Sequence, residues 1–184
     1  MKYIILNKPF NILSQFKEVE GKENLKKFIN IREKPKAVGR LDYDSEGLLI
    51  LTDDIEFSNF ITHPENKIEK EYHVQVEGCL TENDLKPIFL GIQTNSEYYK
   101  PARAELIAEP PYLWERIPPI RFRKSIPTSW LKLILREGKN RQVRKMTAFI
   151  KFPTLRLVRY RIGKITIEDL KPGEWREVSW RDIC

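Results

Sequence analysis

The sequence predicts an α+β protein with a mostly antiparallel mixed sheet and short flanking helices. Three observations favour this class. Segments in which apolar and polar residues alternate outnumber segments with helical spacing, and the helical segments are short. Strands and helices do not alternate regularly, as they would in a parallel β/α protein. Hydrophobic residues make up 41% and charged residues 32% of the 184 residues, which is typical of a globular protein with a substantial core.

The N-terminal part is predicted to contain two strands and a helix. The strands, at residues 3–6 and 12–16, flank an Asn-Lys-Pro-Phe sequence that favours a turn. Residues 23–31 have the spacing of a short amphipathic helix, because their apolar side chains recur on one face.

The next elements are predicted from an apolar run, an alternation and two capping sequences. Residues 47–51 are almost wholly apolar, as in a buried strand, and the Thr-Asp-Asp that follows can cap a helix at residues 55–62. Residues 70–77 alternate, which predicts a strand with one buried face. A weak capping box and a closing glycine predict a helix over residues 81–90.

Two further alternating segments, residues 102–108 and 130–136, predict strands on either side of a long loop. The loop, residues 109–129, contains five prolines, which cannot continue a helix or a central strand. An irregular loop of this length in a compact domain is usually functional or disordered. The remaining predicted elements are a helix at residues 140–150 and strands at residues 155–161 and 174–178.

Several classes of protein are disfavoured by composition. No apolar run approaches the roughly 18 residues of a membrane span, and the first apolar segment is too short for a secretory signal. Cys79 and Cys184 have no His or Cys nearby at metal-ligand spacing, so neither a disulfide scaffold nor a zinc site is expected. We expect a cytoplasmic protein in which residues 1–184 form a single domain of two closely joined halves.

The basic residues are concentrated in one stretch. The net charge is +7, and residues 136–164 contain ten Lys or Arg but only one acidic residue, Glu137. A solvated basic face is the simplest interpretation of a charge run. Here the basic residues alternate with aromatic and aliphatic ones, which indicates a folded surface that binds nucleic acid.

Residues 38–54 carry the most informative motif. Three carboxylates, Asp42, Asp44 and Glu46, lie between two glycines and precede the apolar strand. An acidic turn is one interpretation. A calcium loop is another, since the spacing of the acidic residues follows the EF-hand template. However, the flanking segments lack helical spacing, and Asp53 stands where a bidentate Glu is preferred.

The string Gly-Arg-Leu-Asp-x-x-Ser-x-Gly-Leu-Leu, which contains Asp42, resembles the active-site motif of the ribosomal small-subunit pseudouridine synthase A family. Three further segments resemble motifs of that family in the same order, at residues 70–76, 137–146 and 155–176. The resemblance implies a sheet with a central active-site cleft. Many members carry a small RNA-binding domain of the S4 type before the catalytic domain, and no such domain is expected in this chain.

The resemblance also implies a reaction and its residues. A uridine of ribosomal RNA, with the large subunit expected, would be isomerised to pseudouridine after the base is flipped into the site. Asp42 would be the nucleophile, Arg144 its basic partner, and Tyr72 the ring that stacks on the base. Core packing is the alternative for Tyr72, and a phosphate contact is the alternative for Arg144.

The expected partners follow from the same resemblance. Candidate RNA contacts are Arg40, Lys139, Arg141, Lys145, Arg156 and Arg159, with Arg121 and Arg123 in the proline-rich loop. The reaction needs neither metal nor cofactor, and we expect a monomer without membrane contact. The main alternative is a non-catalytic module that binds ribosomal RNA or assists ribosome assembly, while a DNA-binding regulator lacks any helix-turn-helix or zinc-finger pattern.

Overall fold

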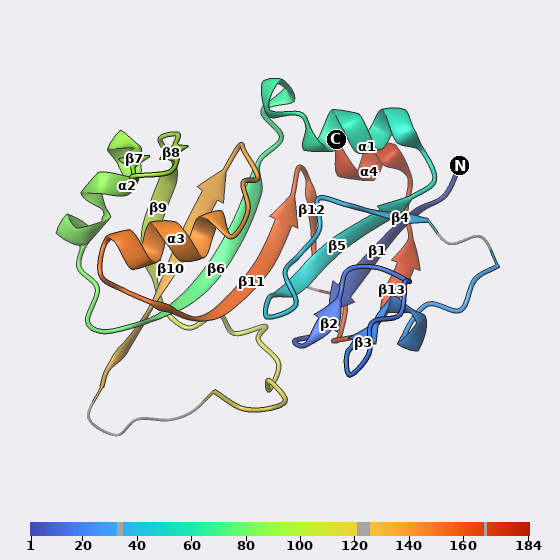
Figure 1. Ribbon diagram of the computed structural model, residues 1–184, viewed down its shortest axis with the longest axis horizontal. Coiled ribbons are helices and arrows are strands. Elements are labelled where there is room, and N and C mark those ends of the chain that lie inside the picture. Colours follow the sequence, from blue (N-terminus) through green and yellow to red (C-terminus); the bar gives the residue numbers. More distant parts are fainter. Residues whose placement is uncertain (33–34, 121–125, 168) are drawn as a thin grey trace.

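The computed structural model describes residues 1–32, 35–120, 126–167 and 169–184 (Figure 1). Within these residues, the main sheet has nine strands in the order β13-β1-β5-β11-β6-β10-β9, with β4 beside β5 and β12 beside β11. Their bounds are β1 (Tyr3–Lys8), β4 (Lys36–Val38), β5 (Glu46–Thr52), β6 (Lys70–Glu77), β9 (Arg103–Ile107), β10 (Thr128–Leu135), β11 (Thr154–Ile162), β12 (Ile165–Thr166) and β13 (Trp175–Glu177).

Short helices and two small ribbons surround this sheet. The α-helices are α1 (Ile55–Thr62), α2 (Lys86–Leu90), α3 (Gln142–Phe149) and α4 (Trp180–Ile183). The 3-10 helices are η1 (Leu25–Lys27), η2 (Pro64–Asn66) and η3 (Glu82–Leu85). The ribbons pair β2 (Ile12–Leu13) with β3 (Glu23–Asn24), and β7 (Ile92–Gln93) with β8 (Tyr98–Tyr99). The predicted α+β class with a mostly antiparallel mixed sheet is confirmed.

The two halves of the main sheet meet at a parallel pairing of β5 with β11, whereas the other pairings in this sheet are antiparallel. In its register, Gly47 lies opposite Arg159. Gly47 has a φ of +104°, and a Cβ there would lie 2.4 Å from the Arg159 carbonyl oxygen. Only glycine therefore permits this approach of the two strands.

Three hydrophobic clusters stabilise the halves. One packs β6 and β10 against α2 and α3, and includes Val74, Leu131 and Met146. A second joins β5 and β11 to α1, and the third lies on the other face of β1 and β5. In Figure 1, α2 and α3 lie over the left half, while α1 and α4 lie side by side at the top of the right half. No described helix is long and apolar enough to cross a membrane.

The capping sequences behave as expected. The Asp54 side chain accepts a hydrogen bond from the Phe57 amide at 3.0 Å and begins α1. Thr81 and Asp84 form a reciprocal capping box at η3, which continues directly into α2. Both helix predictions are confirmed, although the second begins as a 3-10 turn.

The helix predicted over residues 23–31 is wrong. Only one 3-10 turn forms, at η1, because Asn24 pairs with β2 and its side chain accepts from the Lys26 amide. Leu25 and Ile29 are buried as their spacing predicted, but a turn and an irregular segment bury them. The strand predicted at residues 12–16 shortens to β2, which pairs parallel to β3.

Strand β6 is buried along most of both faces, not on one face as predicted. Tyr72 joins the cluster under α3, while His73 stacks on Tyr160 with ring centroids 4.5 Å apart. His73 Nδ1 also lies 2.7 Å from the hydroxyl oxygen of Tyr112 in the proline-rich loop. The loop thus covers the face that the alternation had assigned to solvent.

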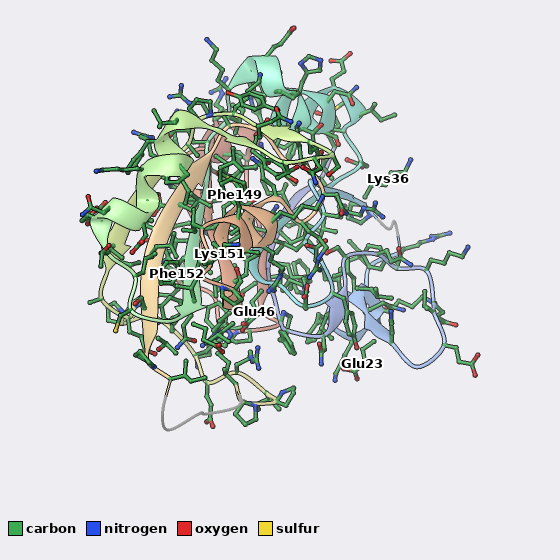
Figure 2. All side chains as sticks on the ribbon, turned by 60° about the vertical axis from the view of Figure 1, so that its left-hand side comes forward. Glu23, Lys36, Glu46, Phe149, Lys151 and Phe152 are labelled. Carbon is green, nitrogen blue, oxygen red and sulfur yellow. The ribbon has the colours of Figure 1, made fainter. Side chains whose placement is uncertain are left out.

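The described part of the predicted loop contains neither helix nor strand before β10. Its anchor is Trp114, whose Nε1 donates to Glu46 Oε1 at 2.8 Å. Arg116 adds a second anchor, with its guanidinium 4.2 Å from the centre of the Phe10 ring. Figure 2 shows Glu46 near the middle of the molecule, whereas Glu23 and Lys36 lie on the side formed by the N-terminal segments.

Candidate active site

A pocket of about 490 Å³ opens where the two halves of the sheet meet. Its walls come from the segment after β2, the loop between β4 and β5, strands β6 and β11, and the segment before α3. Its polar lining residues include Ser14, Arg40, Asp42, Ser45, Lys70, Tyr72, Lys139, Arg141 and Arg159. The fold therefore gathers residues from positions 14 to 159 around one pocket.

The loop that carries Asp42 is tied to the segment after β2. Ser14 Oγ donates to the Leu41 carbonyl oxygen at 2.6 Å and accepts from the Leu41 amide at 3.2 Å. The Ser45 amide donates to the Asp42 carbonyl oxygen at 3.1 Å and closes a turn. The Asp42 side chain remains 33% exposed at the pocket wall, so a substrate can reach its carboxylate.

Asp44 anchors this loop to the start of α3. Both terminal nitrogens of Arg141 contact its carboxylate, at 3.0 and 2.9 Å. Arg144 donates to the Asp44 carbonyl oxygen at 2.6 Å, and its Nε lies 3.4 Å from Oδ2. Burial raises the pKa of Asp44, but the two guanidinium groups outweigh burial and hold that pKa below its usual value.

The expected direct pairing of Arg144 with Asp42 is therefore replaced, among the described residues, by pairing with Asp44. The reason is geometric: α3 begins at Gln142, so Arg144 lies under the loop, where Asp44 presents both a carbonyl and a carboxylate. Arg141 has the ion-pair distance to Asp42, at 3.7 Å between Nη1 and Oδ2. Asp44, predicted to be only a turn residue, links the loop to both arginines.

Arg159 enters the pocket from β11 and is only 2% exposed. Its Nε donates to the Leu48 carbonyl oxygen at 2.7 Å, and its Nη2 has no hydrogen-bond partner among the described residues. Burial lowers the pKa of Arg159, while the Tyr72 hydroxyl and the Asp42 carboxylate oppose that shift. The predicted contact of Arg159 with the RNA backbone stays a prediction, and its burial in the pocket favours contact with a group bound inside the pocket over contact with the backbone.

Tyr72 contributes both to the hydrophobic core and to the lining of the pocket. Its ring belongs to the cluster under α3, and the residue also lines the pocket. The strand period of two places Lys70 on the same face, and Lys70 lines the pocket as well. The geometry thus brings Asp42, Tyr72 and Arg159 together, with Arg144 behind the loop.

Arg156 is the clearest correction among the predicted RNA contacts. It is 6% exposed, and its Nε and Nη2 contact the Glu46 carboxylate at 2.9 and 3.0 Å. Its Nη2 also donates to the Trp114 carbonyl oxygen at 3.0 Å. A buried carboxylate needs such a partner, so Arg156 joins the proline-rich loop to the sheet and does not face a phosphate.

The other predicted RNA contacts lie at or near the pocket rim. Arg40 is exposed, and Lys139 and Arg141 line the opening. Lys139 Nζ donates to the Tyr98 carbonyl oxygen at 2.6 Å, and Lys145 Nζ lies 3.1 Å from Glu97 Oε2. These weak surface pairs leave the lysines accessible to a phosphate. Arg121 and Arg123 lie outside the described residues.

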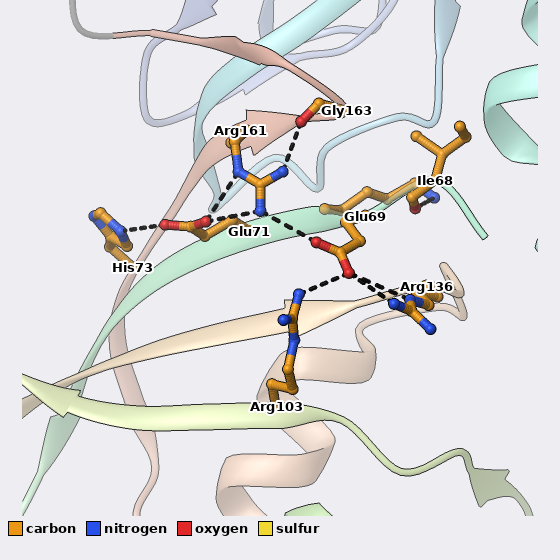
Figure 3. Close-up of polar contacts among 9 residues, drawn as sticks. Ile68, Glu69, Glu71, His73, Arg103, Arg136, Arg161 and Gly163 are labelled. Atoms are coloured by element: carbon orange, nitrogen blue, oxygen red, sulfur yellow. Dashed lines mark hydrogen bonds and ion pairs between the residues drawn. The ribbon is translucent and has the colours of Figure 1, made fainter. Parts of the chain in front are cut away.

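Further basic residues pair with carboxylates of neighbouring strands, as Figure 3 shows. Glu69 pairs with Arg103 at 2.6 Å and with Arg136 at 3.0 Å, joining β6 to β9 and to the end of β10. Arg161 of β11 contacts Glu69 at 3.4 Å and Glu71 at 3.0 Å. Arg136 and Arg161, two members of the basic stretch, therefore pair with carboxylates next to or within β6. The number of basic residues in the stretch is larger than the number left unpaired for RNA binding.

Two buried lysines were missed by sequence reasoning. Lys8 donates to the Pro9 and Ile12 carbonyl oxygens at 2.9 and 2.8 Å, and burial lowers its pKa to about 7. Lys70 is 5% exposed, and burial together with the charge of Arg159 lowers its pKa to about 8. The burial of Lys70 could have been predicted from the sequence, because Lys70 precedes Tyr72 by two residues and therefore lies on the same face of the strand.

The calcium alternative does not fit this geometry. The loop is followed by β5 and not by a helix, and Asp44 and Glu46 are already paired with arginines. Among the described residues, no group of three or more His, Cys, Asp or Glu is placed to hold a metal ion.

Comparisons with known proteins identify the class. The family model for RNA pseudouridylate synthases matches residues 2–149, and the chain belongs to this family of enzymes. A crystal structure of a pseudouridylate synthase superposes with a TM-score of 0.81 at 28% identity, covering 99% of this chain and 72% of that one.

Two relatives within this family show high sequence identity to the chain. The chain is 52% identical over 178 residues to ribosomal large subunit pseudouridine synthase E of Vibrio vulnificus, covering 97% of this chain and 75% of that protein. It is 44% identical over 175 residues to the protein of the same name in Xanthomonas campestris pv. campestris, covering 94% of this chain and 93% of that protein.

Proposed function

We propose that this pseudouridine synthase modifies a uridine of large-subunit ribosomal RNA, in the cytoplasm and as a monomer, with Asp42 as the nucleophile. The observation that carries the proposal is the accessible Asp42 carboxylate in a pocket that also holds Tyr72 and the buried Arg159. The substrate follows from the relatives, whose names specify the large ribosomal subunit.

Asp42 supplies the covalent chemistry. The reaction breaks the bond between ribose C1′ and uracil N1 and joins C1′ to C5, while a proton leaves C5 and another is gained at N1. A carboxylate that bonds to the substrate and later leaves divides this rearrangement into easier steps. Asp42 suits the role because its side chain stays partly exposed while its backbone is fixed by the Leu41 and Ser45 contacts.

Arg159 and Tyr72 complete the site. The Arg159 guanidinium is held by the Leu48 carbonyl, and its charge acts on Asp42 across the pocket, so it favours the ionised carboxylate. The Tyr72 ring offers an apolar face to the flipped base, and its hydroxyl lies near Arg159. Arg144 acts through Asp44, and we assign it a positioning role in place of direct pairing with Asp42.

The rim binds the RNA backbone. Flipping a base out of a folded RNA costs a few kcal/mol, which contacts to neighbouring phosphates must offset. Arg40, Lys139 and Arg141 line the pocket, Lys145 lies on the same helix face one turn after Arg141, and all four charges are at least partly exposed to solvent.

The decisive experiment replaces Asp42 with Asn, which removes the nucleophile at nearly constant size. Pseudouridines are mapped in large-subunit ribosomal RNA from cells without this protein, with the wild type, and with the D42N variant. We expect one position to be restored by the wild type and not by the variant, while the purified variant still binds RNA. A restored position with D42N would exclude Asp42 as nucleophile. No altered position with the wild type would instead favour the non-catalytic RNA-binding module.

A further inference from the structure

Lys70 places an ammonium group in the pocket wall. It lies on β6 two residues before Tyr72 and on the same face, so the two side chains leave the strand roughly 7 Å apart. Its strand partners are Leu135 on β10 and Ile162 on β11, both apolar. Lys70 therefore lines the pocket between two apolar strand neighbours.

No carboxylate among the described residues pairs with this ammonium. Within the described part of the chain, its one hydrogen bond is to the Ile68 carbonyl oxygen, at 3.4 Å. Its chain neighbours Glu69 and Glu71 lie on the opposite face of β6, where Arg103, Arg136 and Arg161 engage them (Figure 3). A buried cation without a partner is unfavourable for the fold, which favours a ligand as its partner.

Two other pocket residues also have polar groups whose hydrogen-bonding capacity is not satisfied. Arg159 Nη2 and Ser45 Oγ are both buried without a hydrogen-bond partner among the described residues, and both residues line the pocket. Buried polar groups are nearly always hydrogen-bonded, so unsatisfied groups on residues that line one pocket favour an oxygen atom that arrives with the substrate. Arg159 is the β11 partner of Tyr72, which lies two residues from Lys70 on β6, and Lys70 and Arg159 both line the pocket.

We propose, building on the function above, that Lys70 and Arg159 form a subsite for the carbonyl oxygens of the flipped uracil. When the bond between C1′ and N1 breaks, the base retains the electron pair, and the negative charge spreads onto O2 and O4. Fixed cations at these oxygens stabilise the detached base while it turns. The electron pair is returned when C5 bonds to C1′, and Lys70 remains an ammonium throughout.

The test compares Lys70→Met, which removes the charge at similar length, with Lys70→Arg, which retains it. The probe is an RNA oligonucleotide spanning the uridine identified by mapping, and single-turnover rate and Kd are measured separately. We expect Lys70→Met to lower the rate about 100-fold, as for loss of one electrostatic donor, with Kd changed by less than about twofold. Lys70→Arg should retain most of the rate.

A second RNA carries uncharged methylphosphonates on either side of the target uridine. It distinguishes whether Lys70 binds a carbonyl oxygen of the base or an oxygen of a neighbouring phosphate. If Lys70 holds a phosphate, Lys70→Met will raise Kd on the normal RNA, and the modified RNA will abolish the difference. That result would overturn the assignment to the base, and so would an unchanged rate with a lower Tm. The Lys70 proposal can also fail without the proposed function. That would be the result if the wild type is active, D42N is inactive and Lys70→Met is fully active.

A pH profile of the rate tests the role of the Lys70 charge even if Lys70→Met fails to fold. The charged form of Lys70 is the active one, so the wild-type rate should be full below pH 8 and fall as pH rises through about 8. Arginine stays charged there, so Lys70→Arg should lose this fall. The other charged or titratable groups of the pocket are Arg40, Asp42, Tyr43, Tyr72, Lys139, Arg141 and Arg159. A fall shared by both proteins would belong to one of these groups and overturn the proposal.

Discussion

Gly47 of β5 and Arg159 of β11 face each other at the parallel pairing that joins the two halves of the sheet. A Cβ at Gly47 would lie 2.4 Å from the Arg159 carbonyl oxygen and 2.8 Å from its amide nitrogen. The side chain of the same arginine enters the pocket beside Asp42 and Tyr72. The junction between the halves and the placement of the buried guanidinium therefore depend on one glycine.

Gly47→Ala should destabilise the protein and reduce turnover. The φ of +104° and the backbone contact together lead us to expect a loss of about 2 kcal/mol or more in the free energy of unfolding. Urea unfolding measures the loss, and Gly21→Ala is the matched control, since Gly21 also has a positive φ of +71° but a Cβ there meets nothing within 4 Å. Equal effects at both positions would contradict the role given to the close approach.

Arg156→Met should lower the free energy of unfolding by about 3–5 kcal/mol, because it leaves the Glu46 carboxylate without its charged partner in the interior. Arg103→Ala breaks an exposed pair with Glu69 and should cost at most about 1 kcal/mol. Denaturant unfolding compares the two variants. If Arg156→Met is stable but flattens the salt dependence of RNA binding, Arg156 contacts phosphate after all.

Rim cations should contribute to RNA affinity in a salt-dependent way. Arg40→Ala and Lys145→Ala should each flatten the slope of log K against log salt by about 0.7–0.9, the value for one phosphate contact. Lys67→Ala removes the same charge from an exposed residue at the C-terminal end of η2 that does not line the pocket. Binding is measured across a salt series, and an equal effect of Lys67→Ala would show that only total charge matters.

Lys8 should make stability depend on pH. Its folded pKa of about 7 lies below that of an exposed lysine, so between these values the unfolded chain binds more protons than the folded one. The free energy of unfolding contributed by this group therefore rises as pH increases from about 7, by about 1.4 kcal/mol per pH unit at most. Lys8→Met should lack this component. Unfolding of both proteins at pH 7, 8 and 9 measures it, and parallel curves would contradict a buried Lys8 with a lowered pKa.

Much of the local structure follows from the sequence. The alternation of residues 70–77, the apolar run at residues 47–51 and the caps at Asp54 and Thr81 each predict an element that forms. Alternation by itself also places Tyr72 and Lys70 on one face of their strand. These signals suffice because the hydrogen bonds and side-chain directions involved span only a few residues.

Two predictions failed because other parts of the chain competed. The spacing of residues 23–31 fits a helix, but pairing of Asn24 with β2 ends any helical pattern there. The polar face of β6 looked solvated, but Tyr112 and Tyr160 cover His73. A spacing rule identifies which side chains are buried, and it does not identify the segment that buries them.

The sequence by itself determined the order of the motifs, the α+β class, and the candidates Asp42 and Tyr72 for the pocket, but not Lys70. Only the tertiary structure decided what each charge does. Arg156 and Arg159 lie three residues apart on one strand and looked alike, yet one pairs with Glu46 and the other enters the pocket. The partners that decide this, Glu46 and Leu48, lie 110 and 111 residues away in the chain. A charge is stable inside a protein only where the fold supplies its partner, and no local pattern records that partner.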